Sequence, residues 1–192
     1  MNLISTNCAG SYVMSRSNEP LGNPFAWAFV TYSSVDALMD HFDDIRWYNF
    51  TIERNPRVKN TFSLRIDNQL LVHYIHYHLN PKYPTPHIVG HEIESSRIWE
   101  YVVNAYIRRT NRMLQLNVPP KFLVMQNNSS GSCQEFIDLY NKYSNCKHKT
   151  CWCAWDDTKI PDGPNVIRVQ RKDMPIAIVN RCYNTIMQIL GS

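Results

Sequence analysis

The chain has 192 residues, of which 44% are hydrophobic and 19% charged, and its formal net charge at pH 7 is +4. This length suits one domain with a substantial core, so we predict a single domain over residues 1–192. The charge is too small to indicate a nucleic-acid-binding protein, although it is compatible with a modestly anionic ligand.

Segments that would direct the chain to or across a membrane are not found in the sequence. No run approaches the roughly 18 apolar residues that a membrane-spanning helix needs. The N-terminus has no basic segment followed by an apolar core. We therefore expect a cytoplasmic protein, whose six cysteines are reduced and available for thiol or metal chemistry.

Residues 2–12 begin as a short apolar run, break into a polar turn at Asn7 and Cys8, and resume as a helix to about Arg16. This pattern predicts that the Cys8 thiol lies where a strand ends and a helix begins. Unpaired backbone N–H groups and the positive end of the helix dipole favour a thiolate at such a place. The alternative is that Cys8 is a small buried residue at the edge of the sheet.

The next elements are a loop, a buried run and a helix. Turn-forming residues fill 18–24, and residues 25–30 are apolar throughout. A helix is predicted to open at Ser33 and Ser34. Its inner face carries Val35, Leu38, Met39 and Phe42.

Residues 62–66 and 70–77 alternate with period two around a turn at Asp67 and Asn68, which predicts a β-hairpin. The alternation puts His73 and His76 on opposite faces of the second strand. The two histidines therefore cannot both serve one site.

The longest predicted helix begins near residue 95 and ends near residue 116, before two prolines. At about 100° per residue, Arg109 falls inside its apolar face and Arg112 at the edge of that face. An inward guanidinium needs a partner, because an unpaired buried cation is expensive. The partner is either an anionic ligand, gripped by two parallel hydrogen bonds, or one of the carboxylates of Asp43, Asp44 and Glu100.

Short runs at 122–125, 150–155 and 165–169 predict three further strands. Helices are predicted to begin at Ser132, where Glu135 completes a capping box, and at Pro175. The inner face of the last helix carries Ile176, Val179, Tyr183, Ile186, Met187 and Leu190.

This alternation of strands and helices is that of an α/β fold. We predict a single layered domain with a mixed, mostly parallel sheet flanked by helices, and one β-hairpin. In such folds, chemistry collects at the carboxyl ends of the strands. Cys8, His76 and the turn at 156–157 all lie near predicted strand ends.

Four residues of zinc-binding type, Cys146, His148, Cys151 and Cys153, lie close together in the sequence. Structural zinc sites usually take their ligands from two separated pairs, whereas Cys151 and Cys153 would share one strand face. The alternative is a thiol-rich turn that leads into a buried strand with tryptophans in the core. We predict no resident metal and no cofactor.

Four short motifs occur in order along the chain: Ser-Thr-Asn-Cys-Ala-Gly at 5–10, Asn-Pro-Phe-Ala-Trp at 23–27, Ile-His-Tyr at 75–77, and the arginines of 108–112 before the strand at 122–125. In order and spacing they resemble a bacterial family of papain-like cysteine peptidases. A close sister family is associated with exopolysaccharide biosynthesis. The resemblance extends to about Met125.

The resemblance implies that Cys8 is a nucleophile and that His76, rather than His73, is its base. One branch of the family has an aspartate where this chain has Ala26, so a candidate orienting carboxylate is missing there. The resemblance also implies contacts with the substrate by Asn7, Trp27, Tyr77, Arg109 and Arg112.

Three functions are open on these observations. The first is a cysteine-nucleophile hydrolase or transferase in which Cys8 and His76 act on an anionic or carbonyl-containing substrate. The second is a non-catalytic binding module for a phosphorylated small molecule or nucleotide, gripped by Arg109 and Arg112. The third, implied by the sister family, is a role in surface-polysaccharide metabolism, with a glycan precursor as the partner. No nucleic-acid partner is expected.

Overall fold

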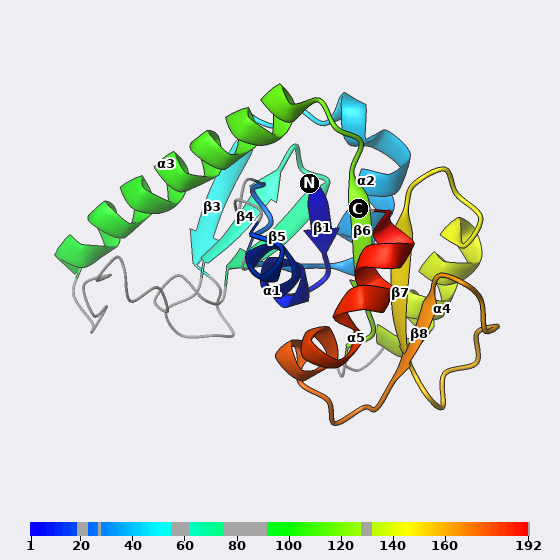
Figure 1. The fold of residues 1–192 in the computed structure, drawn as a ribbon. Coiled ribbons are helices and arrows are strands. Elements are labelled where there is room, and N and C mark those ends of the chain that lie inside the picture. Colours follow the sequence, from blue (N-terminus) through cyan, green and yellow to red (C-terminus); the bar gives the residue numbers. More distant parts are fainter. Residues whose placement is uncertain (19–22, 27, 55–61, 75–91, 128–131, 192) are drawn as a thin grey trace.

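The computed structural model describes residues 1–192 except 19–22, 27, 55–61, 75–91, 128–131 and 192. Within these ranges the chain is an α/β fold with a parallel and an antiparallel four-stranded sheet (Figure 1). No helix in these ranges is both long and apolar enough to cross a membrane. The helices are α1 (Ala9–Arg16), α2 (Tyr32–His41), α3 (Glu92–Leu116), α4 (Ser132–Tyr143) and α5 (Pro175–Leu190), with a 3-10 helix at Phe42–Asp44.

The parallel sheet has the strand order β1-β6-β7-β8. Each strand is short, and all residues of β7 are buried, as expected for a strand covered on both faces. The strands are β1 (Leu3–Ser5), β6 (Lys121–Met125), β7 (Thr150–Trp155) and β8 (Val166–Val169).

Helices cover both faces of the parallel sheet, because alternate side chains of its strands point to opposite sides. Trp152 of β7 lies in one core with residues of α2 and α4. Cys151 and Cys153 lie in the other core, with residues of α1 and α5. Figure 1 shows α1 and α5 together in front of this sheet.

The antiparallel sheet has the order β2-β5-β4-β3, formed by Ala28–Val30, Leu70–Tyr74, Phe62–Ile66 and Phe50–Arg54. Asp67 and Asn68 close the hairpin between β4 and β5 with φ values of 49° and 56°, the combination of a type I′ turn. The buried Asp67 carboxylate accepts a hydrogen bond from Arg46 Nε at 2.8 Å, which fastens the segment before β3 to the hairpin. Above this sheet, the α3 ring of Tyr106 lies 4.6 Å from that of Phe50.

The two sheets meet where their edge strands end. The N–H of Val30, the last residue of β2, donates to the carbonyl of Thr6, just beyond β1, at 3.3 Å. Near the start of β1, the side-chain amide of Asn23 donates to the Leu3 carbonyl. The mixed sheet that the sequence predicts is therefore built as a parallel and an antiparallel sheet that adjoin along β1 and β2.

The α/β class, the mostly parallel sheet and the hairpin are confirmed, whereas several details differ. The N-cap of α2 is Thr31, not Ser33, because the Thr31 side chain accepts the Ser34 N–H at 3.3 Å. The helix α3 begins at Glu92, and β3 was not predicted. Ile176 is 45% exposed and Ile178 is buried instead, which corrects the inner face of α5 at its first turn.

Candidate functional site

The neighbouring parallel strands β1 and β6 mark a switch in topology. Leu3 lies opposite Lys121 and Ser5 opposite Leu123, but the helices that follow the two strands pack on opposite faces of the sheet. In Figure 1, α1 lies in front of the sheet and α4 behind it. Ligands of open α/β sheets bind outside the carboxyl ends of such a strand pair. The described residues at this switch point are Thr6, Asn7 and Cys8 after β1, and Gln126 and Asn127 after β6.

Side chains fix the end of β1 to β6. The Thr6 hydroxyl accepts the Met125 N–H at 2.9 Å and donates to the Met125 carbonyl at 3.1 Å. From α2, the Tyr32 hydroxyl donates to the same carbonyl at 2.9 Å and accepts the Asn127 N–H at 3.0 Å. Burial raises the pKa of Tyr32, so its hydroxyl stays protonated and keeps both bonds.

The first turn of α1 lies directly on β1. A Cβ atom at Gly10 would be 2.7 Å from the Cβ of Ser5, so only glycine allows this approach. Cys8 is the N-cap residue, with φ −65° and ψ −5°. This is ordinary helical backbone, unlike the strained strand-to-helix turn of a nucleophile elbow. The sulfur is therefore positioned by packing of the helix and not by backbone strain.

The Cys8 thiol is half-buried, and burial raises its pKa, although its own backbone N–H partly offsets this effect. Its predicted place, between a strand end and a helix start, is confirmed. The predicted preference for a thiolate is wrong, because loss of solvent around the sulfur outweighs the favourable backbone groups. Near neutral pH the side chain is a thiol, and it needs a base to become a nucleophile.

Asn7 shares the turn with Cys8 and caps the helix in its place. Its Oδ1 accepts the Ala9 N–H at 2.9 Å, whereas the Cys8 side chain makes no capping hydrogen bond. Asn7 is only 6% exposed. Asn7 and Cys8, two of the residues that the sequence predicts in the site, are neighbours in the chain and share this turn.

The β6 side of the switch point carries residues that sequence reasoning missed. Gln126 Oε1 accepts the Trp155 N–H at 3.0 Å and the Thr158 hydroxyl at 2.6 Å, and its Nε2 donates to Cys133 Sγ at 3.3 Å. These bonds join the ends of β6 and β7 to the start of α4. The available signal was the polar Gln126 directly after a buried apolar strand.

Arg109 is half-buried, as its place on the helical face predicts, and its Nη1 donates to the Ala26 carbonyl at 3.4 Å. Among the described side chains, neither Asp43 nor Asp44, two of the three predicted carboxylate partners, pairs with it. The side chain of Glu100, the third predicted partner, lies outside what the structure describes. Its hydrogen bond is thus to Ala26, and among the described residues no hydrogen bond joins Arg109 to Cys8. With one carbonyl as its hydrogen-bond partner among the described side chains, this guanidinium has further N–H donors with which it could bind an anion.

Four further residues that the sequence predicts in the site are not placed beside Cys8 by the described part of the chain: Arg112, Trp27, His76 and Tyr77. Arg112 is exposed on α3, because a long side chain at the edge of a helical face extends into water.

No protein-family model matches the chain, and no curated protein matches it. Trp27, His76 and Tyr77 lie outside the described residues, so their roles stay predictions from the motifs.

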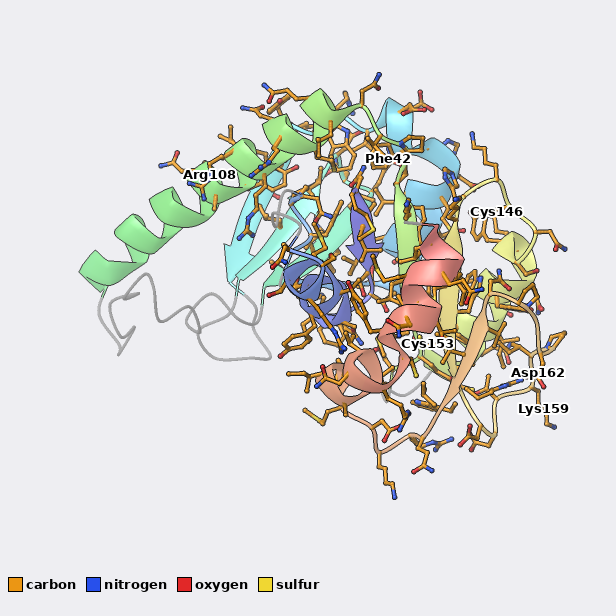
Figure 2. All side chains as sticks on the ribbon, in the orientation of Figure 1. Phe42, Arg108, Cys146, Cys153, Lys159 and Asp162 are labelled. Atoms are coloured by element: carbon orange, nitrogen blue, oxygen red, sulfur yellow. The ribbon has the colours of Figure 1, made fainter. Side chains whose placement is uncertain are left out.

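The four residues of zinc-binding type do not come together. Cys151 and Cys153 share one strand face, as predicted, in the core with α1 and α5. His148 Nε2 instead donates to the Met39 carbonyl of α2 at 3.0 Å. Figure 2 shows Cys146 and Cys153 well apart. In the part of the chain that the structure describes, no three His, Cys, Asp or Glu side chains form a group that could hold a metal ion.

A cavity of about 470 Å³ lies between α2 and α4, beside Tyr32. Three carboxylates and one ammonium group line it, those of Asp36, Glu135, Asp138 and Lys142. The ammonium of Lys142 lies 2.8 Å from Asp36 and 2.8 Å from Asp40, so it is already paired. The charge of this cavity does not suit the anionic substrate that the sequence predicts.

Proposed function

We propose that the protein is a cysteine-nucleophile hydrolase or transferase whose site is the switch point between β1 and β6. The observation that carries this proposal is the position of the half-buried Cys8 thiol in the turn after β1. Cys8 is the nucleophile and His76 its general base. The substrate is an anionic or carbonyl-containing small molecule.

The raised pKa of Cys8 supports a base-assisted nucleophile over a preformed thiolate. Burial raises the pKa of the Cys8 thiol above its ordinary value, so the side chain is protonated near neutral pH. An enzyme with such a thiol must remove its proton during attack, which is the function of a neighbouring imidazole. With an imidazole base, whose ordinary pKa is near 6.5, the rate at which the sulfur reacts would follow the titration of the imidazole.

The proposal is tested by alkylation of the full chain with iodoacetamide, followed residue by residue with peptide mass spectrometry. The alkylation rate of wild-type Cys8 should rise as an imidazolium loses its proton at about pH 6–7 and then reach a plateau. A second rise should follow above about pH 9, where the thiol itself ionises. In His76→Ala the plateau near neutral pH should vanish. Only the alkaline rise should remain, because the Cys8 thiol, whose pKa is raised, then reacts only when it ionises by itself.

His41→Ala is the matched control, because His41 is an exposed histidine of α2. Its profile should equal that of the wild type. The exposed Cys133 reports reagent quality in every sample. A wild-type profile without the neutral plateau, or one that His76→Ala leaves unchanged, would contradict the proposal.

A second candidate function is a binding module for a phosphorylated small molecule or nucleotide. The half-buried Arg109, without a carboxylate partner among the described residues, favours it. A pocket with one such guanidinium would recognise phosphate without any reaction at Cys8. We further propose a cytoplasmic role in surface-polysaccharide metabolism, which is supported by the resemblance of the motifs alone.

A further inference from the structure

Three thiols lie in one layer, between the parallel sheet and α5. Cys151 and Cys153 of β7 are fully buried, and they project from the same face of that strand. Cys182 of α5 is half-buried and packs against the same core. This layer therefore holds nucleophilic groups that the proposed reaction at Cys8 does not use.

The inner face of α5 directs Cys182 toward β7. Ile178 and Ile186 are buried, and Cys182 lies midway between them in the same row, because residues four apart lie above one another on a helix. Both isoleucines belong to the core that contains Cys151 and Cys153, and α5 contacts β7 directly. The Cys182 side chain therefore faces the side of β7 from which the two buried thiols project.

The level of Cys182 along β7 follows from the ends of the two elements. Gly191, just after α5, lies against the side chain of Lys149, just before β7. Figure 1 shows α5 running along the sheet against the direction of the strands. The nine residues from Gly191 back to Cys182 span about 14 Å of helix, and the four from Lys149 to Cys153 span about 13 Å of strand. Cys182 is therefore level with the part of β7 that carries Cys151 and Cys153.

The three thiols differ in their access to a reagent and in their surroundings. The neighbouring Cys153 thiol and burial raise the pKa of Cys151, with a smaller contribution from nearby Cys182, so Cys151 stays protonated. The Asp173 carboxylate, and next the Cys182 thiol, raise the pKa of Arg181, which keeps a cation beside the Cys182 sulfur. A partly exposed thiol beside a cation is the kind that peroxides oxidise first. Cys182 is therefore the thiol that reacts from solution, and the enclosed thiols of β7 are within its reach.

We infer that Cys182 is a site of oxidation by hydroperoxides and that it then forms a disulfide with Cys151. The Cys182 sulfur, on losing its proton, attacks one peroxide oxygen: an S–O bond forms, the O–O bond breaks, and the other oxygen leaves as hydroxide, which takes up the proton to give water. The sulfur is oxidised to a sulfenic acid and the peroxide is reduced. The Cys151 sulfur then displaces the sulfenic oxygen, which leaves as water with the Cys151 proton. The resulting disulfide joins α5 to the sheet, and a thiol reductant reverses it.

The test treats the folded full chain with hydrogen peroxide, alkylates the remaining thiols with iodoacetamide in denaturant, and maps tryptic peptides of the monomer by mass spectrometry without reduction. Trypsin cuts after Lys149, Lys159 and Arg181, so Cys151 and Cys182 fall in separate peptides, 150–159 and 182–192. Oxidation should join these two peptides, with the bond at Cys151, and dithiothreitol should release them. In urea the linkage should fall about tenfold, because shorter loops between other cysteines then close more readily.

Three variants complete the design, and thermal melts establish that each is folded. Cys182→Ala should abolish the linked peptide. Cys151→Ala should leave the sulfenic acid at Cys182 unresolved, so that dimedone traps it there. Cys146→Ser is the matched control and should link fully, because it changes a half-buried cysteine outside the layer and keeps a donor for the His148 carbonyl. Cys182→Ala changes a half-buried residue, which keeps the test decisive if the core substitution prevents folding.

The outcomes decide the inference without reference to the proposed function, which depends on Cys8 alone. Joined peptides in the wild type and in Cys146→Ser, lost in Cys182→Ala, support it. A bond within peptide 150–159 while Cys182 is still alkylated by iodoacetamide overturns it. Oxidation of Cys182 to a sulfinic acid without linkage, or linkage as abundant in urea as in the folded chain, also overturns it. A bond from Cys182 to Cys153 overturns the choice of Cys151 as the partner.

Discussion

Replacement of Gly10 by alanine tests whether the switch point depends on the close approach of α1 to β1. The added Cβ would lie 2.7 Å from Ser5 Cβ, 3.5 Å from Ser5 Oγ and 3.8 Å from Leu3 Cδ2. The first distance is far inside van der Waals contact, and the neighbour is the Cβ of a strand residue, which moves only with its backbone. We therefore expect α1 to be pushed away from β1.

Two opposing effects set the magnitude. Overpacking of a close contact costs about 1–3 kcal/mol, whereas alanine in place of glycine in a helix gains up to about 1 kcal/mol. The steric effect should win, with a net loss of about 1–2 kcal/mol. For a chain of this size that loss lowers Tm by about 2–8 °C.

Thermal and urea unfolding, followed by circular dichroism, measure this loss. Gly163→Ala is the matched control, since its Cβ would meet Asn165 Oδ1 at an ordinary 3.5 Å. Ser5→Gly removes the opposing Cβ, so in the double variant most of the loss should be recovered as a coupling energy. A Gly10→Ala protein as stable as the wild type, or strict additivity in the cycle, would refute the steric argument.

Two further substitutions test the anion site and the loop after β7. Arg109→Gln should abolish any rise in Tm that millimolar pyrophosphate gives the wild type. Cys8→Ala should retain the rise, and so should the control Arg108→Gln, which changes an exposed arginine. A rise in Tm that survives Arg109→Gln would reject the second candidate function. Arg168 donates to the carbonyls of Trp155, Thr158 and Ile160 at 3.1, 2.9 and 2.6 Å, so Arg168→Lys should loosen the loop that carries Lys159 and Asp162 (Figure 2). Trypsin should then cut after Lys159 about tenfold faster, as judged by mass spectrometry, but not in the control Arg171→Lys; an unchanged cutting rate would show that these bonds do not hold the loop.

The elements with strong local signals could be predicted from the sequence. The continuous run of β7 and the proline that opens α5 are examples, since each depends on neighbouring residues alone. The strand β3 was missed because its alternation of Phe50 and Ile52 is short and ends in Glu53 and Arg54. Charges are common on edge strands, and β3 is stabilised by its pairing with β4, which no local pattern contains.

The candidate site divides in the same way. The turn at Asn7 and Cys8 was visible as a break in an apolar run, and the structure places it at the end of β1. The raised pKa of Cys8 was not visible, because it depends on how closely the folded chain covers the sulfur. The network of Gln126 joins residues from three elements, so only the assembled fold reveals it.

The pairing of β1 with β6 also sets when the site can form during synthesis. Leu3 of β1 can pair with its partner Lys121 of β6 only after the 118 residues that follow Leu3 have been synthesised. At about 5–20 residues per second, a ribosome needs about 6–24 s to supply that strand. Until then the nascent turn has no parallel neighbour, and its sulfur is as open to electrophiles as that of any unfolded cysteine. Protection of the thiol is thus acquired late, from a part of the chain that is made long after the cysteine itself.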